Sequence, residues 1–177
     1  STEQGILQKP YSGGTIDMSV ATKVQLGTFC WVDLMTSNQV AAQSFYSGLF
    51  GWMGNAVPMP DGTYTIQIHN HHRVAGMASG AAHPAWPCYI TGEDIQASLA
   101  AVKTNGGQVT MEPHEVPGEG TMANCTDPTG AAFALWQPAK QGSDQVRGFG
   151  MMCWHELMTN DFDKAKQFYE ASFGWTS

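Results

Sequence analysis

Three of the six histidines fall within four residues, at His69, His71 and His72. In a β-strand, side chains two positions apart point to the same side, so His69 and His71 could hold a metal ion together. Asn70 lies between them, and asparagine is typical of tight turns. It favours an exposed hairpin turn that is rich in histidine, and we keep His69 and His71 as an alternative metal site only.

A second candidate for chemistry is Asp33, the acidic residue of the otherwise apolar segment Cys30–Met35. Burying a carboxylate is costly unless the group is paired or used. If the segment is a strand, Trp31, Asp33 and Met35 share one side, while Val32 and Leu34 face the other side, toward the helix. Asp33 then either contacts a ligand or makes a structural hydrogen bond to a neighbouring strand or helix.

An internal repeat indicates which elements position these residues. Residues 30–52 and 153–175 are identical at 11 of 23 positions, with an offset of 123. The first copy predicts a short strand and then a helix, which Ser37 or Asn38 can cap and Gly51 can end. The second copy predicts a strand at 151–157 and a helix at about 161–173.

Turn signals divide the rest of the chain into further strands. We predict two βαβββ units, residues 26–80 and 85–138, with helices at about 38–50 and 93–104. The second repeat copy opens a third unit at 149–177, expected to be an incomplete second domain that follows a linker at 140–148. Residues 1–25 show no clear period and are expected to form an arm. The predicted fold class is α+β.

The composition disfavours several classes of partner. The 177-residue chain is 42% hydrophobic and only 13% charged, which is typical of a folded globular protein. Its net charge of −7 disfavours nucleic acid and anionic membranes as partners. We find neither a long apolar run nor a basic segment leading into one, and we expect a cytoplasmic protein. The four cysteines are widely separated, as expected of buried free thiols.

The repeat combines Trp-x-Asp/Glu-Leu-x-Thr with Phe-Tyr-x-x-x-Phe-Gly-Trp, and the string Asp127–Pro138 follows the first copy. Together these motifs resemble the glyoxalase / bleomycin resistance / extradiol dioxygenase superfamily, the vicinal oxygen chelate fold. The resemblance is closest to two-domain glyoxalase-like members. It covers about 26–139 as a complete domain and 147–177 as the start of a second. It implies paired βαβββ units that form a curled, barrel-like mixed sheet with helices outside and a ligand pocket on the concave faces.

In the enzymes of the superfamily, the resemblance implies a divalent metal on His, Glu or Gln side chains from the first and last strands of each unit. Here the corresponding positions fall on Trp31, near Pro87 and near Ala134, whose side chains do not bind metal ions. The strand Arg73–Ser79 offers no acid, amide or imidazole either. We therefore expect no metal and no other cofactor.

The main hypothesis is a small-molecule binding protein of the glyoxalase/bleomycin-resistance type, which holds an aromatic or hydrophobic ligand in a metal-free cavity. Alternate side chains of a strand lie on the same face, a rule called strand parity below. It predicts that the ligand-binding residues are Trp31, Asp33, Met35, Tyr89, Ala134 and Trp136. The alternative is a metal-dependent lyase, isomerase or dioxygenase of the same superfamily. A third hypothesis is a degenerate fragment whose remaining role is assembly with a partner.

The predicted helix at 161–173 carries an apolar stripe that includes Phe168 and Tyr169 and that needs a cover. One arrangement is a homodimer in which residues 149–175 dock on a second copy of the chain. The other is docking on the flank of the chain's own barrel, together with the arm at 1–25. We favour the homodimer because symmetric dimers are the commonest soluble assembly.

Overall fold

The structure is a computed structural model, and it describes residues 25–60, 62–140 and 148–176. Almost all of the predicted arm at 1–25 and most of the predicted linker at 140–148 therefore lie outside the described residues. None of the helices in the described ranges is long and apolar enough to cross a membrane.

Two βαβββ units follow each other along the chain, as predicted. The first consists of β1 (Phe29–Thr36), α1 (Gln39–Phe50), β2 (Met53–Met59), β3 (Gly62–His69) and β4 (His72–Ser79). The second consists of β5 (Cys88–Thr91), α2 (Ile95–Thr104), β6 (Gln108–Val116), β7 (Gly120–Thr126) and β8 (Ala132–Pro138). The predicted helices at 38–50 and 93–104 are confirmed as α1 and α2, and the predicted helix at 161–173 as α3 (Phe162–Phe173).

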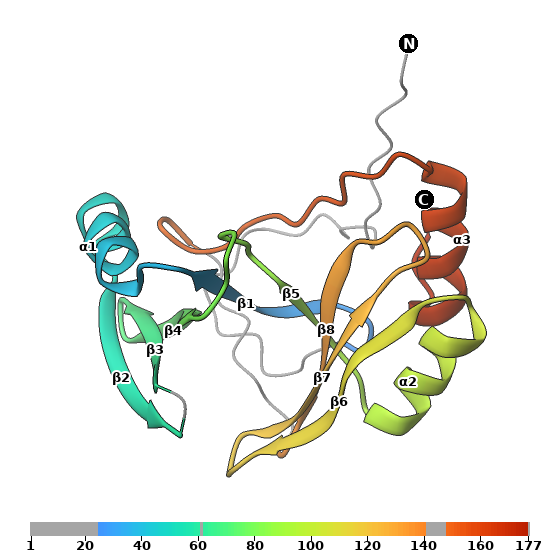
Figure 1. Ribbon diagram of the computed structural model, residues 1–177, viewed down its shortest axis with the longest axis horizontal. Coiled ribbons are helices and arrows are strands. Elements are labelled where there is room, and N and C mark those ends of the chain that lie inside the picture. Colours follow the sequence, from blue (N-terminus) through green and yellow to red (C-terminus); the bar gives the residue numbers. More distant parts are fainter. Residues whose placement is uncertain (1–24, 61, 141–147, 177) are drawn as a thin grey trace.

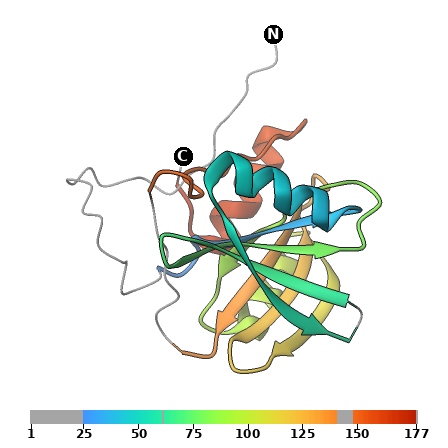
Figure 2. The same cartoon turned by 90° about the vertical axis from the view of Figure 1, so that its left-hand side faces the viewer.

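The strands form one eight-stranded mixed sheet in the order β2-β3-β4-β1-β5-β8-β7-β6. The two units meet where β1 pairs antiparallel with β5. Within the units, β1 runs parallel to β4 and β5 runs parallel to β8. The sheet curls into a half-barrel, with α1 at one end and α2 together with α3 at the other (Figure 1). The turned view shows α1 lying across the first unit (Figure 2). The expected α+β class and the curled sheet are confirmed.

The core is divided into two clusters that lie between the helices and the convex side of the sheet. Val32 and Leu34 of β1 belong to the first cluster, against which Ala42 and Tyr46 of α1 pack. This confirms the prediction that Val32 and Leu34 face the helix. The second cluster is larger and joins β5, β7 and β8 to both α2 and α3.

The predicted strand at 151–157 is not formed. Residues 148–160 instead run outside the sheet as an irregular segment, with Met151 and Met152 packed on the first cluster and Leu157 on the second. The physical reason is the absence of a ladder: β1 of the first repeat copy lies between β4 and β5, whereas no strand of the described residues pairs with 151–157. Alternation alone does not make a strand without a partner.

Helix α3 docks on the flank of its own chain. Phe168 and Tyr169 are only 2% and 4% exposed, and their rings contact Phe133 of β8. The end of α2 is also tied to α3, because Asn105 Nδ2 donates to Ser172 Oγ at 3.1 Å. The stripe is thus covered by the flank of the chain's own barrel, while the part that the arm at 1–25 was expected to play lies almost wholly outside the described residues. Association of two chains stays a prediction, which light scattering can check.

Candidate functional site

The side chain of Asp33 lies at the centre of a hydrogen-bonded group on the concave side of the sheet. Trp31 Nε1 and Tyr64 OH donate to Asp33 Oδ1 at 2.8 and 2.7 Å. Tyr89 OH donates to Oδ2 at 2.5 Å. These four residues, here called the Asp33 network, come from β1, β3 and β5, so the network joins both units. Three donors satisfy most of the acceptor capacity of one carboxylate.

Electrostatics keep the two phenols of the network in their donor form. Burial and the neighbouring Asp33 charge both raise the pKa of Tyr64 and of Tyr89 well above the ordinary value. Burial also raises the pKa of Asp33, while the hydrogen bonds from Tyr64, Tyr89 and Trp31 act in the opposite direction. The network is therefore a buried acceptor surrounded by fixed donors.

Gly76 of β4 makes room for the network. It lies beside Asp33 in the parallel β1–β4 ladder, and Tyr64 reaches over it from β3. A Cβ atom at position 76 would overlap both the Tyr64 hydroxyl and the Asp33 carboxylate. A residue without a side chain is needed here so that two neighbouring strands can send polar groups to one point.

Arg73 reaches the same side of the sheet because β4 contains a bulge. The β3–β4 register pairs Gln67 with Ala75 but Ile68 with Arg73, so Val74 is the extra residue. Without the bulge, Arg73 would point away from the concave face. Burial has the largest effect on the pKa of Tyr64 and raises it. The Arg73 guanidinium, which the bulge brings close to Tyr64, lowers this pKa.

Arg73 forms an ion pair with Glu119, which lies in the turn between β6 and β7. Arg73 Nη1 donates to Glu119 Oε1 and Oε2, both at 3.0 Å. Three strands separate β4 from β7 in the sheet, which is about 19 Å along a flat sheet at the usual strand spacing. The contact therefore requires the strong curl of the sheet, and it crosses the concave face from one unit to the other.

The structure brings three of the six predicted ligand-binding residues, Trp31, Asp33 and Tyr89, into direct contact. Ala134 is fully buried and pairs with Tyr89 in the β5–β8 ladder. Trp136 and Met35, both half-buried, lie two positions along their strands from Ala134 and from Asp33. The six positions thus share one face, as the alternation of side chains along each strand predicts.

Sequence reasoning missed three residues of this region. Tyr64 could have been found, because it alternates with Ile66 and Ile68 in a predicted strand. Gly76 could have been suspected as a glycine within a strand interior. Arg73 could not have been placed from parity, because the bulge at Val74 reverses the side to which it points.

The histidine-rich segment is a hairpin turn, as Asn70 indicated. Asn70 and His71 have φ angles of 48° and 68°, and His69 pairs with His72 across the turn. Two consecutive residues in the left-handed region are typical of a type I′ turn. His71 therefore lies in the turn rather than in the strand, and the parity argument that placed His69 and His71 on one side is wrong.

Outside the network, Cys88 and His155 form another polar contact, with 3.2 Å between Cys88 Sγ and His155 Nδ1. The His155 ring also stacks on Phe29, with 4.2 Å between ring centroids. Burial raises the pKa of the Cys88 thiol to about 11, so this thiol stays protonated near neutral pH. The pair anchors the segment 148–160 and is unsuited to nucleophilic chemistry.

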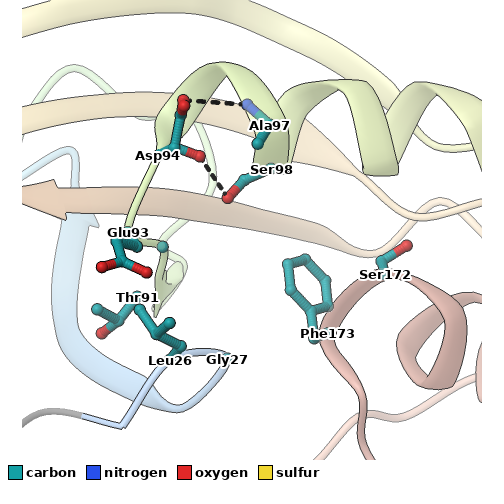
Figure 3. A pocket seen from close by; sticks show the side chains of 10 residues that line it. Leu26, Gly27, Thr91, Glu93, Asp94, Ala97, Ser98, Ser172 and Phe173 are labelled. Carbon is teal, nitrogen blue, oxygen red and sulfur yellow. Dashed lines mark hydrogen bonds between the residues drawn. The ribbon is translucent and has the colours of Figure 1, made fainter.

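A cavity of about 650 Å³ lies between the start of α2 and the end of α3. Figure 3 shows Ser172 and Phe173 on one side of it and Glu93 and Leu26 on the other. Asp94 at its rim caps α2, because Asp94 Oδ1 accepts from the backbone N–H groups of Gln96 and Ala97. The lining includes no residue of the Asp33 network.

Comparison with known proteins agrees with this architecture. Residues 28–135 match the model of the Glyoxalase/Bleomycin resistance protein/Dioxygenase superfamily. The chain belongs to this superfamily. The structure also resembles the Mn(II)-bound glyoxalase from Novosphingobium aromaticivorans, with a TM-score of 0.51 at 17% identity, over 70% of this chain and 42% of that one. At that identity the likeness shows the fold alone.

Two curated relatives are similar over most of the chain. "Putative glyoxylase CFP32" of Mycobacterium bovis is 40% identical over 90% of this chain and 64% of its own length. "Anthracycline biosynthesis protein DauV" of a Streptomyces species is 35% identical over 86% of this chain and 62% of its own length. The chain thus spans less than two thirds of the length of these relatives.

The described residues do not fit the divalent metal that the superfamily implies. No group of three or more His, Cys, Asp or Glu side chains in the described ranges could hold a metal ion. At the expected positions, Trp31 donates its indole N–H to Asp33, and Ala134 has no donor atom. The one carboxylate of the network already accepts three hydrogen bonds. We therefore derive no chemical step through a metal ion.

Proposed function

We propose that this protein binds a small aromatic or hydrophobic molecule on the concave face, without a metal ion, as a binding protein of the glyoxalase/bleomycin-resistance type. The observation that carries the proposal is the Asp33 network. A satisfied carboxylate holds one indole and two phenols in fixed orientations, and aromatic walls with few polar anchors are typical of small-molecule sites.

In this proposal Asp33 positions the aromatic side chains and does not itself hold the ligand. Its oxygens are occupied by Trp31, Tyr64 and Tyr89, so a ligand hydroxyl would have to compete with three existing donors. The ligand instead contacts the rings, with Trp136 of the second unit at the same face. This differs from the sequence hypothesis, in which Asp33 could contact the ligand directly.

The name of one relative supports an aromatic ligand. One relative is named as an anthracycline biosynthesis protein, and a planar fused-ring molecule of that kind suits a face of indole and phenol rings. We therefore propose planar, fused-ring aromatic molecules as the ligand class for this chain.

The metal-dependent lyase, isomerase or dioxygenase remains the competing hypothesis for the same face. It requires a set of metal ligands, which the described residues do not offer. A binding experiment with and without divalent ions separates the two hypotheses, because only the enzyme hypothesis makes ligand binding or turnover depend on the metal.

The test is calorimetric titration of the purified chain with 2-naphthamide and 2-naphthoate in EDTA, and again after addition of Mn²⁺, Ni²⁺, Zn²⁺ or Fe²⁺. We expect at least one probe to bind in EDTA with unchanged affinity after metal addition. Trp31→Ala should weaken binding by roughly three- to tenfold through loss of aromatic contact. Trp154→Ala is the matched control, because Trp154 is the repeat partner of Trp31 and is 47% exposed. Binding of neither probe, or binding only with a metal, would overturn the proposal.

A further inference from the structure

The eight strands of the sheet contain a single cationic side chain, Arg73. Every other Lys or Arg of the described residues lies on a helix or at Lys140, after the end of β8. Among the described residues, the strands therefore bring one Lys or Arg side chain to the concave face, in a chain with net charge −7. Of the Lys and Arg side chains on the described strands, only Arg73 can form an ion pair with an anion that enters this face.

Two features of the backbone place the Arg73 guanidinium on the concave face, beside the aromatic side chains of the Asp33 network. The bulge at Val74 turns Arg73 to the side that carries Ile68, Gly76 and the Asp33 network. The curl of the sheet then brings the β6–β7 turn opposite, so that Glu119 meets Arg73. A bulge that re-aims one side chain toward a binding face is a recurrent device near functional sites.

The partner of Arg73 is a carboxylate that can be exchanged. Both oxygens of Glu119 accept from the same nitrogen, Nη1, so the guanidinium is not used in its paired, two-nitrogen form. The side chains are 55% and 49% exposed, and exposed ion pairs add little to stability. Replacing Glu119 by another carboxylate therefore costs the fold little and can gain the better two-nitrogen geometry.

We propose that Arg73 anchors an anionic group of the ligand, and that a carboxylate on the bound aromatic molecule takes the place of Glu119. This inference rests on the proposed function and narrows it from aromatic molecules to aromatic carboxylates. The ring lies against Trp31 and Tyr64, and the carboxylate lies at Arg73. Glu119 then competes with the ligand carboxylate for Arg73. This competition lowers the affinity for anionic ligands and excludes anions that bind weakly.

The test uses two probes that differ only in charge, 2-naphthoate and 2-naphthamide, titrated into the intact chain and three variants. Arg73→Gln should weaken 2-naphthoate binding about tenfold and leave 2-naphthamide within about twofold. Glu119→Gln should strengthen 2-naphthoate binding severalfold, because the competitor is lost while Arg73 remains. Glu112→Gln is the control, since it makes the same change in net charge at an exposed residue of β6.

The outcomes separate the two proposals. One outcome is that 2-naphthamide binds, 2-naphthoate binds no better, and Arg73→Gln changes the affinity of neither probe. The proposal that Arg73 anchors the ligand carboxylate, here called the anchor, is then wrong, and the aromatic binding function stands. If Glu119→Gln and Glu112→Gln strengthen 2-naphthoate binding equally, only the net charge matters and the anchor is again wrong. If neither probe binds the unmodified chain, the proposed function fails and the anchor fails with it. Melting temperatures of all variants within a few degrees of the unmodified chain establish that folding is intact.

Discussion

The two copies of the 23-residue repeat form the same helix but only one strand. Helices α1 and α3 begin at Asn38 and Asp161, which accept from the backbone N–H three residues later, and both end at a left-handed glycine. In the first copy the residues before the helix form β1, whereas in the second they form an irregular segment. The helix is specified by caps within the motif, while the strand depends on neighbours outside it.

The two repeat copies are also joined by a pair of reciprocal hydrogen bonds. Trp52, at the end of the first copy, donates its indole N–H to the carbonyl of Gly150, and Trp175, at the end of the second, donates to that of Gly27. Both distances are 2.6 Å, and the two glycines have φ angles of 72° and 70°. Each glycine lies three residues before the opposite copy, so the contacts are reciprocal. The second copy therefore keeps the symmetric relation to the first although its strand is missing.

The two helices differ most in how they are covered. Phe45 of α1 is 61% exposed, whereas its repeat partner Phe168 of α3 is 2% exposed. Helix α1 packs on the sheet and, through Tyr46, on Trp52 and Trp86, whereas α3 lies against both α2 and β8. The same aromatic residue is thus a surface group in one copy and part of the core in the other.

Phe168→Ala tests this contrast with the largest expected effect. It should lower the free energy of unfolding by about 3–5 kcal/mol, because a fully buried ring is replaced by a cavity. The matched variant Phe45→Ala should change the free energy by no more than about 0.5 kcal/mol, because the ring is already largely in water. Urea denaturation of both variants measures the difference. Equal losses would mean that α1 is covered in solution by something that the structure does not contain.

The difference between local signals such as helix caps and non-local contacts such as strand pairing explains how much of the structure could be predicted from the sequence. The helices could be placed from Asn38, Gly51 and their repeat partners, because caps act within a few residues. The hairpin at Asn70 and His71 could be placed for the same reason. The pairing of β1 with β5 and the reversal of Arg73 by the Val74 bulge depend on residues far apart in the chain, and no local signal reports them.

For the candidate site, parity placed Trp31, Asp33 and Tyr89 on one face correctly. It could not show that Tyr64 would cross Gly76 to reach Asp33, because that contact requires the β3-β4-β1 order. It also predicted a strand at 151–157 from a pattern that the first copy shares, although the second copy has no strand partner among the described residues. The alternation of side chains along a strand predicts the face on which a residue lies. Only the order of the strands in the sheet determines which residues are its neighbours.

The reciprocal contacts predict the next effect in size. Trp175→Phe and Trp52→Phe each remove one indole donor and leave a glycine carbonyl without it, which should cost about 1–3 kcal/mol in each case. Because the two bonds have the same length and both tryptophans are buried, the two losses should agree within about 0.5 kcal/mol. Denaturation curves of the two variants give this comparison directly. A neutral Trp52→Phe beside a damaging Trp175→Phe would show that the Gly150 contact does not form in solution.

The buried carboxyl group of Asp33, in the first repeat copy, should contribute to the pH dependence of stability. Burial raises the folded pKa of Asp33 above its ordinary value of 3.8, so the folded state binds this proton more tightly than the unfolded state does. Asp33 therefore makes the protein less stable as the pH rises from about 4 through its folded pKa. In Asp33→Asn this loss is absent, and the unfolding free energy of the variant relative to the unmodified chain should increase with pH.

Glu156→Gln is the control for that pH series, because Glu156 is exposed in the irregular segment. Only a pH trend that Asp33→Asn shows beyond this control is assigned to the burial of Asp33. Urea denaturation at half-unit steps from pH 4 to 8 measures both differences. A difference for Asp33→Asn that decreases with pH would mean that the three hydrogen bonds outweigh burial and lower the folded pKa.

The smallest effect concerns reactivity rather than stability, at the first residue of each copy. Burial raises the pKa of the Cys30 thiol to about 11, so at pH 8 only about one molecule in a thousand carries the reactive thiolate there. Its repeat partner Cys153 is exposed in the irregular segment. Iodoacetamide should therefore modify Cys153 at least about tenfold faster than Cys30, as peptide mass spectrometry over time would show. Cys153→Ser should remove the fast reaction and leave the slow one unchanged. Equal rates at the two cysteines would mean that β1 opens as readily as a segment with no strand partner, and the difference between the two copies would then not persist in solution.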